Sequence, residues 1–131
     1  MKTILVLEDE PSVVKLLRYM LGHYSLVEAT TAEQALHLFR EHGRQIDLLV
    51  ADVTLPAHSG IQVALLLRTA IPDLPVILTS SYPVSDWSDR DSDDLGRLGV
   101  RSMAILPKPF QAQILLKTVH ELTGGAPPKA A

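Results

Sequence analysis

Short runs of apolar residues alternate along this chain with longer segments in which apolar residues recur at helical spacing. A run of about four to eight apolar residues between turn-forming residues is typical of a strand buried on both faces of a sheet. The clearest run, Leu48-Leu49-Val50-Ala51, ends abruptly at the carboxylate of Asp52. On this basis, strands are predicted at residues 4–7, 25–29, 47–51, 76–79 and 100–106.

Helical periodicity follows each of these strands. The first helix is predicted between Pro11 and Gly22, since proline suits a first helical turn and glycine a helix end. Either Thr30 or Thr31 can cap the second helix, because each is followed three residues later by Glu or Gln. The remaining helices are predicted at residues 61–70, 91–98 and 114–122.

Strands that alternate with helices predict an α/β fold with a parallel sheet, because parallel strands need long crossover connections. Right-handed connections leave few topologies. We expect a flavodoxin-like, doubly wound sheet of five parallel strands in the order 2-1-3-4-5, with helices on both faces. This order makes the first and third strands neighbours, so Glu8, Asp9 and Asp52 are expected to converge at the carboxyl edge of the sheet.

Length and charge narrow the possible functions. The 131 residues, 47% of them hydrophobic, suit one domain over residues 1–123, with a flexible tail over 124–131 and no second effector domain. A net charge of -3 gives no basic surface for nucleic acid. No segment suits a membrane span, and the lack of cysteine suits a reducing compartment. We therefore expect a cytoplasmic protein, monomeric or weakly dimeric.

Three carboxylates at one strand edge repel one another unless a cation is present. Two like charges about 4 Å apart cost roughly 4 kcal/mol at an effective dielectric constant of about 20. Oxygen ligands suit Mg²⁺, or alternatively Mn²⁺, rather than zinc. Lys108 after the last strand and Ser80 after the fourth add an ammonium and a hydroxyl to the same edge. Together these groups suit a phosphoryl group on Asp52.

Each of these residues alone also has an ordinary structural explanation. An aspartate can cap a helix, a serine can form a turn, and a lysine near a helix start can simply be solvated. The interpretation as a site depends on their joint occurrence at matching strand ends. It predicts that Asp52 is the reactive group.

Four motifs resemble the receiver domain of two-component response regulators. They are Glu8-Asp9, residues 52–56 followed by Gly60, residues 75–80, and Lys108-Pro109-Phe110. The resemblance spans residues 2–123. It implies that Asp52 accepts a phosphoryl group from a sensor histidine kinase or a histidine phosphotransfer protein. It also implies a phosphoacceptor that promotes its own phosphorylation and dephosphorylation rather than a classical enzyme, and that signals through a downstream protein.

The resemblance assigns a role to each of the other candidate residues. Asp9, Asp52 and the backbone carbonyl of Thr54 would bind Mg²⁺, and Glu8 would act through a metal-bound water. Lys108 would pair with a phosphoryl oxygen, and Ser80 would be the hydroxyl that closes on the phosphoryl group. Choosing Ser80 over Thr79 rests on its spacing from Pro75, and an error of one residue would reverse the direction of the side chain.

Two features depart from the family pattern. The position three residues before the lysine is usually aromatic in the family, and here it is Ile105. The segment between Ser80 and Lys108 is longer than usual and contains five aspartates within residues 85–94. It is either a solvated loop or a partner surface anchored by Trp87.

Other classes fit less well. A haloacid-dehalogenase-like phosphatase needs a second acid two residues after its nucleophile, where this chain has Thr54. A flavodoxin needs a phosphate loop after the first strand, where Glu8-Asp9-Glu10 would repel phosphate. The open alternative is a receiver-fold binding module that acts without phosphorylation, through the modified surface between the fourth and fifth strands. Phosphate uptake separates it from the phosphoacceptor.

Overall fold

The computed structural model describes residues 2–55 and 58–124. Apart from Gly124, the predicted flexible tail lies outside the described residues, as does Pro56 of the second motif. Five parallel strands form one sheet in the order β2-β1-β3-β4-β5, which confirms the predicted fold class. The strands are β1 (Thr3–Leu7), β2 (Ser25–Ala29), β3 (Ile46–Asp52), β4 (Val76–Ser80) and β5 (Met103–Pro107).

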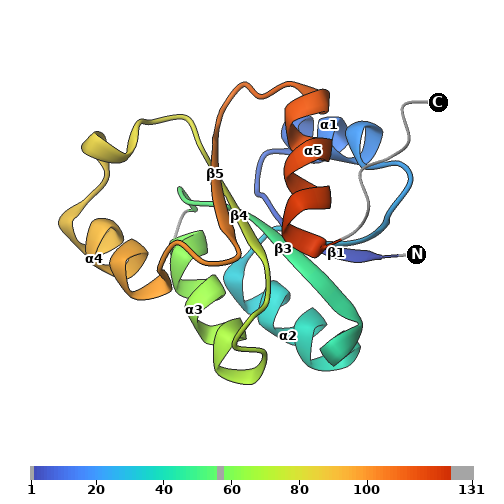
Figure 1. Cartoon of the computed structure of the whole chain (residues 1–131), viewed down its shortest axis with the longest axis horizontal. Helices are drawn as coiled ribbons and strands as arrows, with labels where there is room; N and C mark the ends of the chain where they lie inside the picture. The colour runs from blue at the N-terminus through green and yellow to red at the C-terminus, as the bar shows by residue number, and fades with distance from the viewer. Residues whose placement is uncertain (1, 56–57, 125–131) are drawn as a thin grey trace.

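Helices cover both faces of this sheet (Figure 1). One face carries the first and last helices of the chain, and the other carries the remaining three. The five helices are α1 (Pro11–Met20), α2 (Ala32–His42), α3 (Gly60–Ala70), α4 (Asp89–Leu98) and α5 (Ala112–Thr123). Within residues 2–55 and 58–124, no helix has the length and apolar character that a membrane span requires.

Side chains that alternate along the strands divide the core into two clusters. In β1, Leu5 and Leu7 pack with α2 and α3, whereas Ile4 and Val6 pack with α1 and α5. The central strands repeat this alternation, because successive side chains of a strand point to opposite faces. Both faces of β1, β3 and β4 are therefore buried. Burial on both faces explains why these strands read as continuous apolar runs in the sequence.

Side chains cap the N-termini of three helices, of which only the cap of α2 was predicted. Thr31, not Thr30, is the N-cap of α2, and its side chain accepts a hydrogen bond from the backbone N–H of Gln34. Ser59 caps α3 in a capping box with Gln62. Ser88 caps α4 by accepting from the backbone N–H of Asp91. Each cap satisfies an N–H group that the helix itself leaves unpaired.

Three predicted starts in the second half of the chain were wrong by two or three residues, and one of them is the start of α5, which begins at Ala112 rather than 114. The fifth strand begins at Met103 rather than Val100, because Gly99 and Ser102 take positive φ values of 77° and 53° that interrupt an extended chain. The fourth helix begins at Asp89 instead of 91, after the 3-10 turn η2 (Val84–Asp86). The Asp-rich segment is thus largely helical, with aspartates near a helix N-terminus, where negative charge is favourable.

Arg68 near the end of α3 ties α4 and the start of β5 to the rest of the fold. Its guanidinium group donates hydrogen bonds to the backbone carbonyl oxygens of Leu74, Leu98, Arg101 and Ser102, at 2.9–3.0 Å. Leu98 is the last residue of α4, so one of these bonds satisfies a carbonyl at the helix end. Helix α4 packs mainly on α3. Its position therefore depends on α3 and on Arg68.

Candidate functional site

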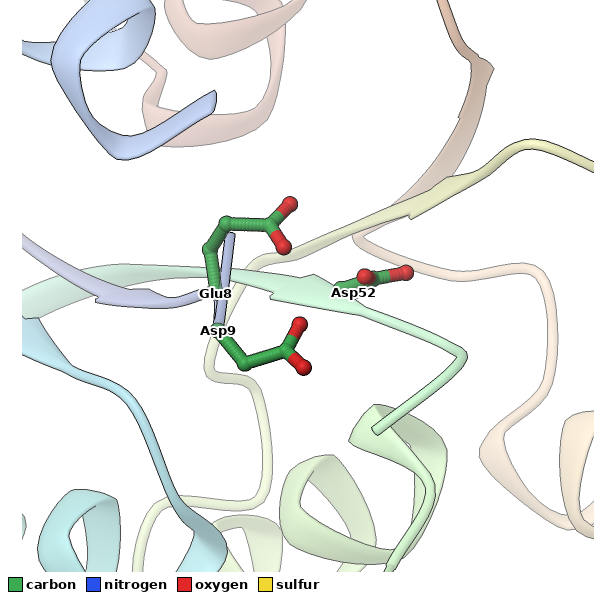
Figure 2. Close-up of side chains that lie close together, drawn as sticks. All are labelled: Glu8, Asp9 and Asp52. Atoms are coloured by element: carbon green, nitrogen blue, oxygen red, sulfur yellow. The ribbon is translucent and has the colours of Figure 1, made fainter. Parts of the chain in front are cut away.

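Three carboxylates from two neighbouring strands meet at the carboxyl edge of the sheet (Figure 2). Glu8 and Asp9 directly follow β1, and Asp52 is the last residue of β3. One carboxylate oxygen of each lies within 4.8 Å of the others. Glu8 and Asp52 are buried, at 1% and 6% exposure, whereas Asp9 is only partly buried. The convergence predicted from the strand order is therefore present.

Lys108 supplies the positive charge that faces these carboxylates. Its Nζ lies 2.7 Å from Oε1 of Glu8 and 3.2 Å from Oδ2 of Asp52, and only 14% of its side chain is exposed. It directly follows β5, and its backbone N–H donates to the carbonyl oxygen of Ser80 at 2.8 Å. Lys108 follows the edge strand β5, and its ammonium group reaches the carboxylates at the ends of β1 and β3.

Burial and charge shift the pKa values of two of these groups. Burial raises the pKa of Glu8, and the nearby charge of Asp52 raises it further, although hydrogen bonding to Lys108 partly opposes both effects. Burial alone would lower the pKa of Lys108, but its contacts with Glu8 and Asp52 outweigh burial and raise that pKa. The lysine is therefore held in its charged form beside Asp52.

The backbone around Asp52 orients its side chain and brings α3 close to the carbonyl group of Asp52. Oδ1 of Asp52 accepts a hydrogen bond of 3.1 Å from the backbone N–H of Thr54. Gly60, the first residue of α3, lies so close that a Cβ atom there would be 2.2 Å from the carbonyl oxygen of Asp52. Only glycine fits this approach of helix to strand. Its role was not predicted, although its place directly after the serine cap of α3 is visible in the sequence.

A cavity of about 240 Å³ opens beside Asp52. Asp9, Asp52 and Lys108 line it, and its other lining residues are Glu10, Thr54, Ser81 and Tyr82. Carboxylate oxygens in an open polar cavity match the ligand preference of Mg²⁺ or Mn²⁺, and Mg²⁺ normally keeps several waters. The donor set therefore fits a hard divalent cation. It does not resemble a typical zinc site, which includes nitrogen or sulfur ligands from His or Cys.

Ser80 occupies this edge of the sheet with its hydroxyl turned to its own loop. It lies one residue beyond Thr79, the register partner of Asp52 in β4, and is 1% exposed. Its Oγ donates to the carbonyl oxygen of Tyr82 at 2.8 Å and accepts from the Tyr82 N–H at 3.0 Å. Ser80 is therefore next to the cavity but is not among its lining residues.

A family model described as the response regulator receiver domain matches residues 4–120 of this chain. The chain belongs to this family. Among known proteins, the response regulator GtcR of Aneurinibacillus migulanus is 36% identical to this chain over 111 residues. The sensor kinase CckA of Brucella abortus is 32% identical over 124 residues.

These two relatives are much longer than this receiver domain. The matched residues are 83% of this chain but 42% of GtcR, and 92% of this chain but 12% of CckA. The chain therefore spans less than half the length of either protein. Both relatives therefore contain regions that lie outside the match.

Two solved structures have folds similar to that of this receiver domain. The response regulator TrrA of Thermotoga maritima, in complex with Mg²⁺ and BeF, is 31% identical with a TM-score of 0.74, over 93% of this chain and 99% of TrrA. The chemotaxis protein CheY4 of Vibrio cholerae has a TM-score of 0.78 over 93% of this chain and 98% of CheY4, at 21% identity. The second likeness is one of fold alone.

The site residues predicted from the sequence fall into two groups in this receiver domain. Glu8, Asp9, Asp52 and Lys108 lie together, and Thr54 lines the same cavity. Ser80, by contrast, has its hydroxyl engaged with Tyr82. Nothing in the residue pattern indicated this engagement, because it depends on the path of the loop after β4.

Proposed function

We propose that this receiver domain accepts a phosphoryl group on Asp52 from a phosphohistidine of a sensor histidine kinase or a histidine phosphotransfer protein. In this proposal it acts as a single-domain response regulator and passes the signal to a downstream protein. The observation that carries it is the position of Asp52, which borders an open cavity with Lys108 3.2 Å from one of its oxygens. A carboxylate beside a fixed ammonium is suited to attack a phosphoryl group whose charge the ammonium can compensate.

The transfer forms one bond and breaks one. An Oδ atom of Asp52 attacks phosphorus, and the bond between phosphorus and the donor's imidazole nitrogen breaks. The electron pair of that bond stays with the imidazole, which takes up a proton from water. Hydrolysis reverses the state of Asp52, because water attacks phosphorus and releases inorganic phosphate with the carboxylate restored. Neither step oxidises or reduces any group.

A divalent cation fits the residues that face this reaction. Asp9, Asp52 and the carbonyl of Thr54 would hold Mg²⁺, with Glu8 contributing through a bound water. When bound, the cation supplies positive charge to the oxygens of the transferring group. The cluster of three carboxylates supports this assignment, since a cation relieves the repulsion among them.

Lys108 and Ser80 would complete the contacts of the phosphoryl group. Lys108 would exchange one of its carboxylate contacts for a phosphoryl oxygen, which carries more negative charge. The phosphoryl group adds a charge of about -1.5 to -2 at neutral pH. Ser80 would rotate its hydroxyl from Tyr82 to another phosphoryl oxygen. Both movements would occur at residues joined by the backbone hydrogen bond from Lys108 to Ser80.

The experiment that tests this function is intact-mass analysis after incubation with acetyl phosphate and Mg²⁺. The native chain should gain the mass of one phosphoryl group. Asp52→Asn should gain none, and excess chelator should suppress the adduct on the native chain. Failure of the folded native chain to form an adduct while it binds Mg²⁺ would contradict the proposal and favour the phosphorylation-independent binding module.

A further inference from the structure

The hydroxyl of Ser80 and the indole of Trp87 share one acceptor, the carbonyl oxygen of Tyr82. Ser80 Oγ donates to this oxygen at 2.8 Å, and Trp87 Nε1 donates to it at 3.2 Å. Ser80 Oγ also accepts from the Tyr82 N–H at 3.0 Å. Ser80, the last residue of β4, and Trp87, in the loop before α4, are thus joined through the backbone of Tyr82.

Trp87 packs on the same face of the sheet that Ser80 faces. Val76, Leu78 and Ser80 alternate onto the side of β4 that holds the α2 and α3 core cluster. Trp87 is partly buried against that cluster. The side chain that the sequence offered as an alternative partner anchor is therefore partly packed within its own fold. Ile105 of β5 packs against the same cluster, at the position where the family usually has an aromatic residue.

The hydrogen bonds of Ser80 and Trp87 depend on each other, because both side chains donate to the carbonyl oxygen of Tyr82. A serine hydroxyl has one proton to donate, so it cannot donate to Tyr82 and to a phosphoryl oxygen at the same time. If the hydroxyl turns to Asp52, the Tyr82 carbonyl keeps Trp87 as its side-chain donor, and the Tyr82 N–H loses its acceptor. A loop that loses two of these three bonds has to change its path or its mobility.

Trp87 also adjoins the start of α4. The next residue, Ser88, is the N-cap of that helix, and its side chain accepts from the backbone N–H of Asp91. In Figure 1 the segment from β4 to α4 extends away from the sheet before the helix begins. A change at Tyr82 therefore reaches the first turn of α4 through residues 83–88.

We propose that Trp87 is a positioning residue that couples the hydroxyl state of Ser80 to the N-terminus of α4 through the Tyr82 carbonyl. This inference rests on the proposed phosphorylation of Asp52 and assigns its conformational response to a particular side chain. In this chain, a tryptophan from the loop before α4 takes the coupling role, while the position three residues before Lys108 is the aliphatic Ile105. The response is therefore predicted in residues 82–91.

The chain contains one tryptophan, so its intrinsic fluorescence reports on Trp87 directly. Emission is recorded before and after acetyl phosphate and Mg²⁺ are added, and intact mass is measured on the same sample. With the adduct formed, we expect a shift in emission and faster hydrogen exchange in residues 82–91. Ser80→Ala should lose the emission shift, Ser80→Thr should restore it, and the matched control Ser85→Ala in η2 should keep it.

A second variant tests the indole N–H itself. Trp87→Phe keeps an aromatic ring but removes the donor, so the exchange response in residues 88–91 should be lost while adduct formation stays at the native level. Full adduct formation with unchanged emission and exchange in the native chain would overturn this inference and leave the proposed function intact. Absence of the adduct would instead contradict the proposed function. A native response in Trp87→Phe would also overturn the coupling role.

Discussion

The carboxyl edge of this receiver domain has two regions with opposite character. The acceptor region, residues 8–9, 52–54 and 108, places charged groups against one another, with Glu8, Asp52 and Lys108 largely buried. The loop and helix region, residues 81–98, is mostly exposed, and the hydrogen bonds of its loop and of its helix cap join residues only two to five positions apart in the sequence. The comparison indicates that the chain is held rigid in the acceptor region and can move in the loop and helix region.

The two regions are held by different parts of the fold. The carboxylates of the acceptor region project from β1 and β3, which are neighbours within the sheet and have both faces covered, and Lys108 follows the edge strand β5. The loop and helix region rests on α3 and on the carbonyl contacts of Arg68. Fewer buried apolar contacts lower the free energy of local opening. We expect substitutions in the first region to reduce global stability and those in the second to change local mobility.

Of the substitutions that compare the two regions, Lys108→Met should reduce the free energy of unfolding most. It leaves two buried carboxylates without their shared cation, and breaking a buried ion pair from one side costs about 3 kcal/mol or more. Urea denaturation without Mg²⁺ measures the loss. Lys117→Met, at a lysine of α5 with 78% of its side chain exposed, is the matched control and should change stability little. Equal effects of the two substitutions would contradict the account of the acceptor region.

Mg²⁺ should stabilise the native chain by an amount set by its affinity. A ligand that binds only the folded state adds about 2.7 kcal/mol at a concentration about 100 times its Kd. Thermal unfolding with and without Mg²⁺ measures this increase. Asp9→Asn should remove most of it, whereas Asp86→Asn, in the loop and helix region, should keep it. A full Mg²⁺ effect in Asp9→Asn would place the cation elsewhere.

Gly60→Ala tests the close approach of α3 to Asp52. The added Cβ would meet the carbonyl oxygen of Asp52 at 2.2 Å, so the helix or the strand has to move. Forcing an extra carbon into a packed site costs about 2 kcal/mol. We expect a lower midpoint in urea denaturation and slower phosphorylation by acetyl phosphate. Gly96→Ala in α4, where a Cβ meets nothing within 4 Å, should show neither effect.

Substitutions at two helix caps, one in each part of the fold, should have the smallest effects on stability. Thr31→Ala and Ser88→Ala each remove a cap bond to a backbone N–H, which costs about 1 kcal/mol. Since α2 packs against the sheet, Thr31→Ala should lower the global unfolding free energy. Ser88→Ala should mainly speed hydrogen exchange in residues 89–92. If Ser88→Ala lowered global stability as much as Thr31→Ala, α4 would belong to the same cooperative unit as α2.

The residue pattern predicted the central features of this fold because those features have strong local signals. Strands buried on both faces read as apolar runs, and the strand order then brings Glu8, Asp9 and Asp52 together. The start of β5 was predicted too early, because Val100 is apolar although it is 85% exposed. Hydrophobicity alone does not reveal the positive φ of Ser102 that interrupts the strand.

The hydrogen bonds of the loop after β4 could not be predicted from residue types. Trp87 donates to a backbone carbonyl five residues earlier. The residue types in this loop are compatible with other hydrogen-bond partners, and the path of the loop decides which of them form. The same applies to Arg68, whose acceptors are carbonyls 6 to 34 residues away. Contacts with the backbone depend on where the chain runs. Only the three-dimensional structure specifies that path.

Locating the phosphoryl group within the chain tests the central claim most directly. Borohydride reduces an acyl phosphate to an alcohol, so a phosphorylated aspartate becomes homoserine and an unmodified one is unchanged. After treatment with acetyl phosphate and Mg²⁺, peptide mass spectrometry should find homoserine at position 52. It should find aspartate at positions 9 and 47. Homoserine at another position, with Asp52 unmodified, would contradict the assignment of Asp52 as the phosphoacceptor.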